Sequence, residues 1–509
     1  MKRSTFLIVL LAGVLLGAAV TVPVMRSVQQ RALLASKYDN WLKLSVIMQK
    51  IDEMYVDSVD HRKVTDAAVT AALAALDPHS IYLPPQKFED ANDDLAGNFS
   101  GIGIQFNVPN DTAIVIEVIP GGPAEKIGML AGDRLLKVDS TCIAGVHFPQ
   151  DSMVRRMKGP AGTKVTVTVR RGAEDIPFNI TRDRIPTHSV DAAFMVSDTV
   201  GFLRLGKFSR TTGEEFALAA HKLRSEGMRH LIVDLRDNSG GFFDQALTLS
   251  NMFLPKGDMI VYMEGLHREK QEFRADGRGA LKDVGLTLLV SDGSASSSEI
   301  FAGAIQDNGR GRLVGRRTFG KGLVQEPVDF TDGSGIRITV ARFYTPSGRC
   351  IQKPYTDDYA YDLYNRYESG EMVAADSMDV SKGGIIPDVF VPVDTTKVGP
   401  FYIKCSRKST AVRFASSWFD GHRAELQAIG DYAALLRYLD GAGLEKSFLE
   451  YARVHDGLVP KADEWKVERQ YMLTQVRALV GRYSKLGDGA FYYLYLDIDD
   501  CFKAAMAEL

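Results

Sequence analysis

The spacing of apolar residues along the chain changes several times, and each change indicates a different kind of structure. An uncharged apolar run covers residues 6–25, and apolar residues then recur at helical spacing over about 33–88. Over about 96–184 the pattern is β-rich, and Val165-Thr-Val-Thr-Val169 alternates with the period of a half-buried strand. Over about 198–393 strand-like runs alternate with amphipathic helical patterns, which is typical of a largely parallel sheet with flanking helices.

Beyond about residue 400 the chain is helical and charged, with an aromatic-rich stretch at Phe491-Tyr-Tyr-Leu-Tyr495 that matches no motif. We expect either a packed helical extension or an oligomerisation or partner-docking domain there. The segments predicted in this way are a signal anchor or signal peptide (1–28), an N-terminal helical segment (29–95), a β-rich segment (96–184), an α/β segment (185–397) and a helical C-terminal extension (398–509).

The N-terminus has the pattern of an export signal. Lys2 and Arg3 precede the apolar run from Phe6 to Met25. About 20 apolar residues suffice to cross a bilayer, so a spanning helix with its basic end in the cytoplasm is predicted. A cleaved signal peptide is the alternative, because Gly17-Ala-Ala19 offers the small residues that signal peptidase requires. We therefore expect a periplasmic or otherwise extracytoplasmic protein that the N-terminal helix anchors to the inner membrane.

Composition narrows the function classes. The chain has 509 residues, 45% of them hydrophobic and 25% charged, so it can bury large cores in several domains. A net charge of -3, without a long basic run, gives no reason to expect nucleic-acid binding. The cysteines at 142, 350, 405 and 501 form no Cys-x-x-Cys pair, which argues against a zinc site or a disulfide scaffold. No metal site and no cofactor is predicted.

Two helices are predicted in the N-terminal helical segment, and the second runs from Val64 to Leu76. Its end is marked by Leu76-Asp-Pro-His-Ser80, because proline breaks the helix. A loop histidine such as His79 can be catalytic, but after a helix it more often caps or packs. Amphipathic helices just outside a membrane can also pair with a second copy of the chain, and burial against the same chain is the alternative.

The β-rich segment resembles a PDZ domain. Ser100-Gly-Ile-Gly-Ile104 leads into an apolar strand, Gly132–Asp139 joins a turn to another strand, and Asp151–Met157 is predicted as a short helix. In PDZ domains such a loop presents backbone N–H groups to the C-terminal carboxylate of a peptide, which adds as a strand beside a helix. The resemblance therefore implies a carboxylate-binding loop formed by Gly101, Ile102, Gly103 and Ile104.

In the α/β segment a glycine pair follows a buried strand. Leu231-Ile-Val-Asp-Leu235 is predicted as that strand, and Asn238-Ser-Gly-Gly241 as the turn into a helix that ends at about Leu254. Consecutive glycines free the backbone to point amides into a cleft, where they can stabilise an oxyanion. A tight strand-to-helix turn without any catalytic part is the alternative.

A serine cluster occupies a second strand-turn-helix junction. Gly293-Ser-Ala-Ser-Ser-Ser-Glu299 follows the apolar run Leu286–Val290 and begins a helix. A nucleophile at a helix N-terminus is well placed for acyl transfer, because the positive end of the helix dipole helps an oxyanion. Ser296-x-x-Glu299 is also a capping box, which would satisfy amides at the helix start. The serine motif alone leaves capping and catalysis equally open.

A lysine between two glycines favours catalysis. A serine hydroxyl needs a neighbouring base, and a lysine kept neutral by burial can serve as one. Lys321 lies in Thr318-Phe-Gly-Lys-Gly322, and its flanking glycines allow the backbone to approach other elements closely. A glycine hairpin that merely carries a lysine is the alternative. Gln325, four residues further on, is able to hydrogen-bond the amine.

Taken together, these motifs resemble those of the carboxy-terminal processing, or tail-specific, proteases. The matching stretches follow the family's order over roughly residues 40–395. They are Leu76-Asp-Pro-His-Ser80, Ser100-Gly-Ile-Gly-Ile104, Gly293-Ser-Ala-Ser296 with Ser298-Glu-Ile300, Thr318-Phe-Gly-Lys-Gly322 with Val324-Gln325, Phe343-Tyr-Thr-Pro-Ser-Gly-Arg349 and Gly384-Ile-Ile-Pro-Asp-Val389.

The resemblance implies a multidomain α+β protein with an N-terminal membrane helix, a helical segment, a PDZ domain at 96–184, an α/β-sandwich protease core (ClpP/crotonase-like) at 185–397 and a helical C-terminal extension. It also implies a Ser-Lys dyad assisted by a glutamine. Carried over to this chain, Ser296 is the nucleophile, Lys321 the general base and Gln325 the residue that orients the lysine.

This chain departs from the family pattern at two positions. Ser297 stands where the family commonly has alanine, and Ser239 stands where it commonly has proline before the glycine pair. Because oxyanion donors are backbone N–H groups, neither change removes one. The donors are assigned to Ser297 and to Gly240 or Gly241.

The function predicted from the sequence is that of a serine endopeptidase. It would recognise protein C-termini through the PDZ domain and cleave exported or membrane-associated proteins through an acyl-enzyme. The expected partners are proteins with accessible C-terminal tails, the membrane and a second copy of the chain, and no nucleic acid. A catalytically silent PDZ scaffold that binds tails is one alternative, and a non-proteolytic acyl hydrolase is another.

Overall fold

The computed structural model describes Met25 and residues 42–108, 111–356, 359–374 and 380–509. The predicted N-terminal membrane helix lies, apart from Met25, outside these residues. Among the residues described, no helix has both the length and the apolar character needed to cross a membrane. The chain separates into two compact units, residues 1–75 and 76–509.

The first unit contains a helix over residues 42–54 and α2 (His61–Ala74). The sequence pattern placed the start of the second helix at Val64. The helix begins earlier because the Asp60 carboxylate accepts a hydrogen bond from the Lys63 amide at 3.1 Å and caps it.

The second unit begins with a short strand that the helical pattern did not predict. This strand, β1 (Ile81–Leu83), pairs antiparallel with the distant strand β18 (Gly335–Tyr344). It precedes α3 (Pro85–Ala96), and Phe88 of that helix is buried. A three-residue strand is too short to show a period of its own, which is why the sequence did not indicate it.

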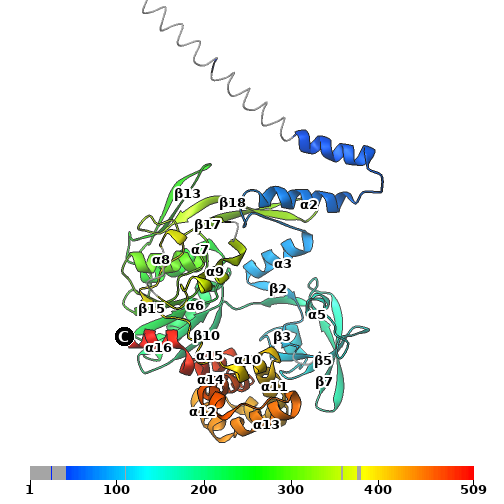
Figure 1. The fold of residues 1–509 in the computed structure, drawn as a ribbon, viewed down its shortest axis with the longest axis vertical. Coiled ribbons are helices and arrows are strands. Elements are labelled where there is room, and N and C mark those ends of the chain that lie inside the picture. Colours follow the sequence, from blue (N-terminus) through cyan, green and yellow to red (C-terminus); the bar gives the residue numbers. More distant parts are fainter. Residues whose placement is uncertain (1–24, 26–41, 109–110, 357–358, 375–379) are drawn as a thin grey trace, which may run out of the picture. The chain divides into compact units, whose positions relative to one another are not determined.

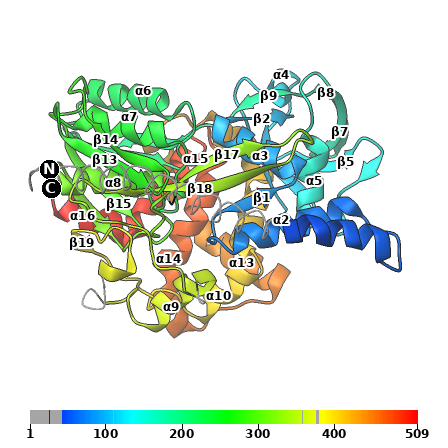
Figure 2. The same cartoon turned by 90° about the horizontal axis from the view of Figure 1, so that it is seen from above.

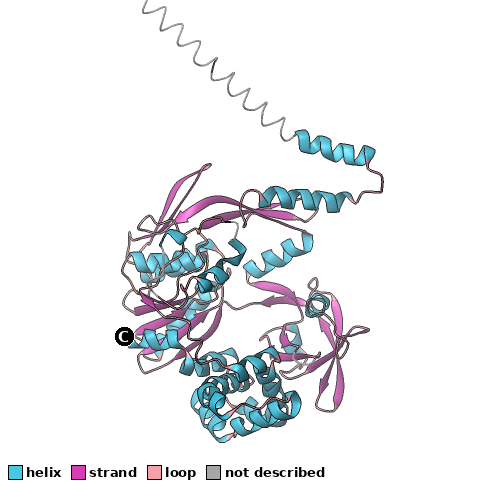
Figure 3. Ribbon diagram, in the orientation of Figure 1, coloured by secondary structure: helices cyan, strands magenta, loops and turns pink. Residues whose placement is uncertain are grey.

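The segment predicted to be a PDZ domain forms a sheet of strand order β3-β4-β5-β7-β8, with β6 beside β5. The period of two is confirmed in β7, where Val165, Val167 and Val169 are buried. Figure 3 shows strands gathered around α5, whereas the C-terminal segment is helical. The elements are β3 (Ile104–Asn107), β4 (Ala113–Val118), α4 (Pro123–Lys126), β5 (Arg134–Val138), β6 (Thr141–Cys142), α5 (Gln150–Met157), β7 (Lys164–Arg171) and β8 (Glu174–Thr181). Next to this sheet, β2 (Asn98–Gly101) pairs with β9 (Asp183–Pro186).

The expected largely parallel sheet is present in the α/β segment. Its order is β10-β11-β12-β15-β16-β19, and every pairing except β10 with β11 is parallel. The strands are β10 (Val190–Met195), β11 (Val200–Leu205), β12 (His230–Asp234), β15 (Gly285–Val290), β16 (Arg312–Gly315) and β19 (Val389–Phe390), and the helices between them are α6 (Thr212–Ser225), α7 (Phe243–Phe253) and α8 (Ser297–Asp307).

A second, antiparallel sheet contains the long ribbon of β17 and β18, which run side by side (Figure 2). It is completed by β1, β13 and β14. The bounds of its remaining strands are β13 (Met259–Gly265), β14 (Arg268–Arg274) and β17 (Leu323–Asp329). Between β18 and β19 lie η1 (Tyr359–Tyr361), α9 (Asp362–Glu368) and η3 (Val380–Lys382).

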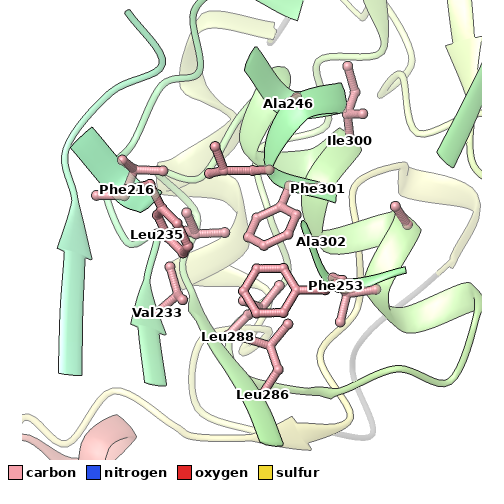
Figure 4. Packing of buried hydrophobic residues seen from close by; sticks show 14 of the residues in the cluster. Phe216, Val233, Leu235, Ala246, Phe253, Leu286, Leu288, Ile300, Phe301 and Ala302 are labelled. Carbon is pink, nitrogen blue, oxygen red and sulfur yellow. The ribbon is translucent and has the colours of Figure 1, made fainter. Parts of the chain in front are cut away.

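One face of the parallel sheet packs against α6, α7 and α8. Phe253 of α7 and Phe301 of α8 lie over Leu286 and Leu288 of β15 (Figure 4). Their ring centroids are 5.9 Å apart. This packing fixes the start of α8, and therefore the serine cluster, relative to the sheet.

The opposite face of the sheet packs against the end of the C-terminal segment. Phe202 and Leu289 of the sheet share a buried cluster with Leu496 and Ala505. In Figure 1 these last helices are drawn in red, and α16 also contacts β15 and β16. The segment consists of α10 (Pro400–Arg407), α11 (Thr410–Ala428), α12 (Tyr432–Gly441), α13 (Leu444–Asp456), α14 (Ala462–Gly481), α15 (Asp488–Tyr495), η4 (Leu496–Ile498) and α16 (Asp500–Ala507).

The Phe301 ring should be a major source of core stability. Phe301 is fully buried, so Phe301→Ala should lower the free energy of unfolding by about 3–5 kcal/mol. Guanidinium denaturation followed by circular dichroism measures this loss. Leu218→Ala, at a residue that is 65% exposed on α6, is the control and should change stability by less than about 0.5 kcal/mol. Equal losses for the two variants would contradict the packing described here.

Candidate active site

Ser296 stands at the junction between strand β15 and helix α8 in an unusual backbone conformation. Its φ of 55° lies in the left-handed region, which non-glycine residues adopt rarely and often at functional sites. Its side chain is half-buried, while Ser297 and Ser298 next to it are buried. The turn therefore presents Ser296 and buries the other two.

The neighbouring serine hydroxyls serve a different purpose. Ser294 donates to the carbonyl of Leu235 at 2.7 Å, and Ser297 donates to the carbonyl of Gly241 at 2.9 Å. Ser298 likewise donates to the Asn238 carbonyl at 2.9 Å. These bonds tie the serine cluster to the turn that contains the glycine pair. Among the residues described, the Ser296 hydroxyl donates to no carbonyl of that turn, while Ser296 and Glu299 form the capping box at the start of α8.

The buried carboxylate of Glu299 connects the serine to the lysine. Its Oε2 accepts hydrogen bonds from the backbone amides of Ser296 and Lys321, each at 2.8 Å. Its Oε1 accepts the amide of Gly320 at 2.8 Å and the hydroxyl of Thr318. Because two amides share one oxygen atom, the backbones of Ser296 and Lys321 are held within two hydrogen-bond lengths of each other. Burial raises the pKa of the Glu299 carboxyl.

Lys321 lies in the loop between β16 and β17, where the flanking glycines permit close packing. Gly320 has a φ of 90°, and a Cβ there would lie 3.2 Å from the amide of Gly384. A Cβ on Gly322 would lie 2.8 Å from the Gln352 amide. The two glycines therefore allow the lysine loop to lie close to neighbouring backbone, as the sequence predicted. Burial lowers the pKa of the Lys321 amine and the Arg337 charge lowers it further, which favours the neutral form.

Arg366 of α9 also holds this loop, and no sequence motif predicted its part. Its guanidinium is buried and donates to the backbone carbonyls of Arg317 at 3.1 Å, Thr318 at 3.0 Å and Phe319 at 3.1 Å. The Arg317 side chain forms a buried ion pair with Glu371 at 2.6 Å. Residues of the segment that follows β18 therefore hold in place the backbone that leads to Lys321.

Gln325 on β17 contacts the turn that follows helix α2. Its Nε2 donates to the His79 carbonyl at 2.6 Å. That turn is itself fixed because the Asp77 carboxylate accepts the amides of His79 and Ser80, each at 2.7 Å. Within the described part of the chain, the Gln325 side-chain oxygen accepts no hydrogen bond, so it is left for another donor.

His79 lies closer to the candidate site than the sequence pattern indicated. Its imidazole hydrogen-bonds the Tyr359 hydroxyl. Burial lowers the pKa of His79 to about 4, and the positive charge of Lys321 contributes to the shift. The histidine is therefore neutral near pH 7 and packs beside the lysine loop.

The glycine turn lies directly against the serine cluster. A Cβ on Gly240 would lie 2.8 Å from the Cβ of Ser296, so only glycine fits there. The Gly240 amide donates to the Asn238 side chain at 2.9 Å. The amides of Gly241 and Ser297 donate to no acceptor among the residues described, which leaves them available to a bound group.

The predicted carboxylate-binding loop leads into β3. The carbonyls of Ile102 and Gly103 accept the amides of Ala124 at 2.9 Å and Ile119 at 3.0 Å. Gly103 has a φ of 83° and is buried with Gly101 and Ile102, while Ile104 is half-buried. Within the described part of the chain, the amides of Ile102 and Gly103 donate to no acceptor. The loop is thus fixed by its carbonyls and keeps donors for a ligand.

Comparison with known proteins identifies both regions. The model of peptidase family S41 matches residues 199–361, and the PDZ domain model matches residues 100–181. Relatives from Staphylococcus epidermidis and Staphylococcus aureus, each described as a probable CtpA-like serine protease, are 33% identical over 355 residues, which is 69% of this chain and 71% of each relative.

Two solved structures are also similar. The photosystem II D1 C-terminal processing protease is 28% identical, over 70% of this chain and 88% of that one, with a TM-score of 0.38. The PDZ domain of a carboxy-terminal protease from Vibrio cholerae, in complex with a peptide, is 30% identical over 17% of this chain and 97% of that one, with a TM-score of 0.16. Because the curated relatives match more than two thirds of both lengths, the chain belongs to the C-terminal processing proteases of peptidase family S41, which are serine peptidases, and it carries a PDZ domain.

Proposed function

We propose that this protein is an endopeptidase that cleaves through a Ser296-Lys321 dyad after its PDZ domain has bound the C-terminus of a protein substrate. The observation that carries the dyad is the Glu299 carboxylate, whose single oxygen accepts the amides of both Ser296 and Lys321. This shared oxygen holds the two backbones close together, and the proposed proton transfer then needs the Lys321 amine to come within hydrogen-bond distance of the Ser296 hydroxyl.

In the proposed reaction, neutral Lys321 takes the proton of the Ser296 hydroxyl as the serine attacks a peptide carbonyl. The Gln325 oxygen accepts a hydrogen bond from the lysine amine and orients it, while the Gln325 nitrogen stays on the His79 carbonyl. The protonated lysine then gives its proton to the leaving amine. Water, activated by the same lysine, hydrolyses the acyl-enzyme and releases Ser296.

The oxyanion of each tetrahedral intermediate needs hydrogen-bond donors. We assign them to the amides of Ser297 and Gly241, since the Gly240 amide already donates to the Asn238 side chain. The Ser297 amide lies at the N-terminus of α8, where the helix dipole adds positive potential.

Substrate selection is assigned to the loop from Gly101 to Ile104, whose amides would bind a C-terminal carboxylate while the peptide adds as a strand. The exported, membrane-anchored location predicted from residues 1–28 remains part of this proposal. Proteins of the cell envelope with accessible C-terminal tails are therefore the proposed substrates.

Removing either member of the dyad should abolish cleavage. Ser296→Ala and Lys321→Ala should each lower kcat for a reporter with a C-terminal tail by more than about a thousandfold. Ser297→Ala keeps its backbone amide and should still form the acyl-enzyme, which mass spectrometry detects. Full activity of Ser296→Ala would refute the dyad. Wild type that binds tails without cutting them would instead support a silent PDZ scaffold.

The pH dependence of kcat/KM should follow the protonation state of Lys321. Because the base acts in its neutral form, kcat/KM should be high above the pKa of Lys321, which burial lowers, and should fall as pH drops through it. Arg337→Gln removes a nearby positive charge and should shift this profile to higher pH. A profile that does not move, measured where circular dichroism shows both proteins folded, would contradict the role of Lys321.

The carboxylate loop should control binding rather than chemistry. Gly103→Ala places a side chain where φ is 83° and a Cβ would lie 3.4 Å from Gly122, so KM for a tailed substrate should rise at least about tenfold while kcat stays the same. Gly172→Ala, with a φ of 61° and open space around it, is the matched control. Fluorescence anisotropy should show that wild type binds a free-carboxylate peptide more tightly than its amide. Equal affinity for both peptides would exclude carboxylate recognition.

A further inference from the structure

We propose that Asp499, in the C-terminal helical segment, is a positioning residue for proteolysis. It acts through Arg236 and fixes the start of the turn that carries Gly241, one of the proposed oxyanion donors. This inference rests on the proposed mechanism and assigns to the C-terminal segment a part in the reaction.

Asp499 forms a bidentate ion pair with Arg236. Its two carboxylate oxygens accept the guanidinium Nη1 at 2.9 Å and Nη2 at 2.5 Å. The Asp499 side chain is 6% exposed, and it also caps α16 by accepting the Phe502 amide at 3.1 Å. A short, well-buried pair of this geometry holds both partners in one orientation.

The other side of Arg236 is fixed by Asp234 at the end of β12. Asp234 accepts the Arg236 Nε at 2.9 Å and Nη2 at 2.7 Å, and it also accepts Nη1 of Arg204 at 2.8 Å. Arg204 has a second carboxylate, Asp191, at 3.8 Å, whereas Arg236 pairs with Asp234 and Asp499. Loss of the Asp499 charge would leave Arg236 with Asp234 alone, a buried carboxylate that it shares with Arg204, which is unfavourable and would displace the Arg236 guanidinium.

If Arg236 were displaced, the glycine turn that follows it would shift as well. Asn238, two residues further on, is fully buried and donates to the Leu205 carbonyl at 2.8 Å. Its side-chain oxygen accepts the Gly240 amide, and its carbonyl accepts the amide of Ala295 at 3.0 Å. The serine cluster is tied to this turn too, but Ser296 and Lys321 are also held by Glu299, which makes no bond to the turn among the residues described. The expected defect is therefore mainly in oxyanion stabilisation.

The next residue supplies a matched control. Asp500 forms an ion pair with Lys397 at 2.7 Å, and this pair also attaches α16 to the rest of the unit without touching Arg236. Asp499→Asn keeps the size and capping ability of the side chain but removes its charge. Asp500→Asn makes the same change one position away.

The experiment compares three measurements for wild type, Asp499→Asn, Asp500→Asn and Asp499→Glu. They are kcat and KM on a tailed reporter, the affinity for a peptide aldehyde that forms an oxyanion on the serine, and the affinity of the same peptide as an unreactive amide. For Asp499→Asn we expect kcat and aldehyde affinity to fall together by about tenfold to a hundredfold, less than the loss of a direct donor. KM and amide affinity should stay unchanged, Asp499→Glu should recover part of the loss, and Asp500→Asn should behave as wild type.

Unchanged kcat in folded Asp499→Asn would overturn the inference, as would equal losses in the Asp499 and Asp500 variants. If Asp499→Asn does not fold, Arg236→Lys replaces it, because it keeps the charge but not the bidentate bond; unchanged aldehyde affinity in that variant would likewise refute the proposal. Ser296→Ala separates the two claims. If it is active, the dyad itself is wrong, whereas an inactive Ser296→Ala beside a normal Asp499→Asn defeats this inference alone.

Discussion

A single buried carboxylate, that of Glu299, holds together two loops that the chain brings from different strands. Burying an ionised carboxyl is unfavourable unless its oxygens are fully hydrogen-bonded. Here the amides of Ser296, Gly320 and Lys321 and the Thr318 hydroxyl provide these bonds. These bonds stabilise the carboxylate, and they also satisfy amides that would otherwise be buried without partners. The unusual backbone of Ser296 is retained because this network overdetermines it.

The parallel sheet is what brings these loops within reach of one carboxylate. In neighbouring parallel strands the carboxyl ends lie at the same edge. Val290 at the end of β15 pairs with Gly315 of β16, and Leu289 pairs with Asp234 of β12. The serine cluster, the lysine loop and the glycine turn therefore leave the sheet side by side. Contacts such as the bond from Ser297 to the Gly241 carbonyl then adjust their positions within the site.

The sequence predicted those parts of the fold that depend on local spacing, such as the alternation in β7 and the strand-helix order of the α/β segment. The capping box of Ser296 and Glu299 was also visible, because it is a local pattern of four consecutive residues. The second set of bonds made by Glu299 was not, since Lys321 is 22 residues away. The contacts of Arg366 are harder still to predict, because backbone carbonyls are present at every residue and leave no trace in the pattern. For the same reason His79 gave no sign of lying beside Gln325.

The C-terminal segment belongs to the same fold as the parallel sheet because the strands of that sheet need to be covered on both faces. Such strands are apolar on both faces and need cover on each. Leu288 faces the helices α7 and α8, whereas Leu289, the next residue, belongs to the cluster that contains Ala505 of α16. Without the last helices, Phe202 and Leu289 would face solvent. An element that must cover the sheet also lies beside the ends of its strands, and Asp499 reaches Arg236 from that position. The packing of the last helices on the sheet therefore explains both how this face of the sheet is covered and how Asp499 comes to act on the glycine turn.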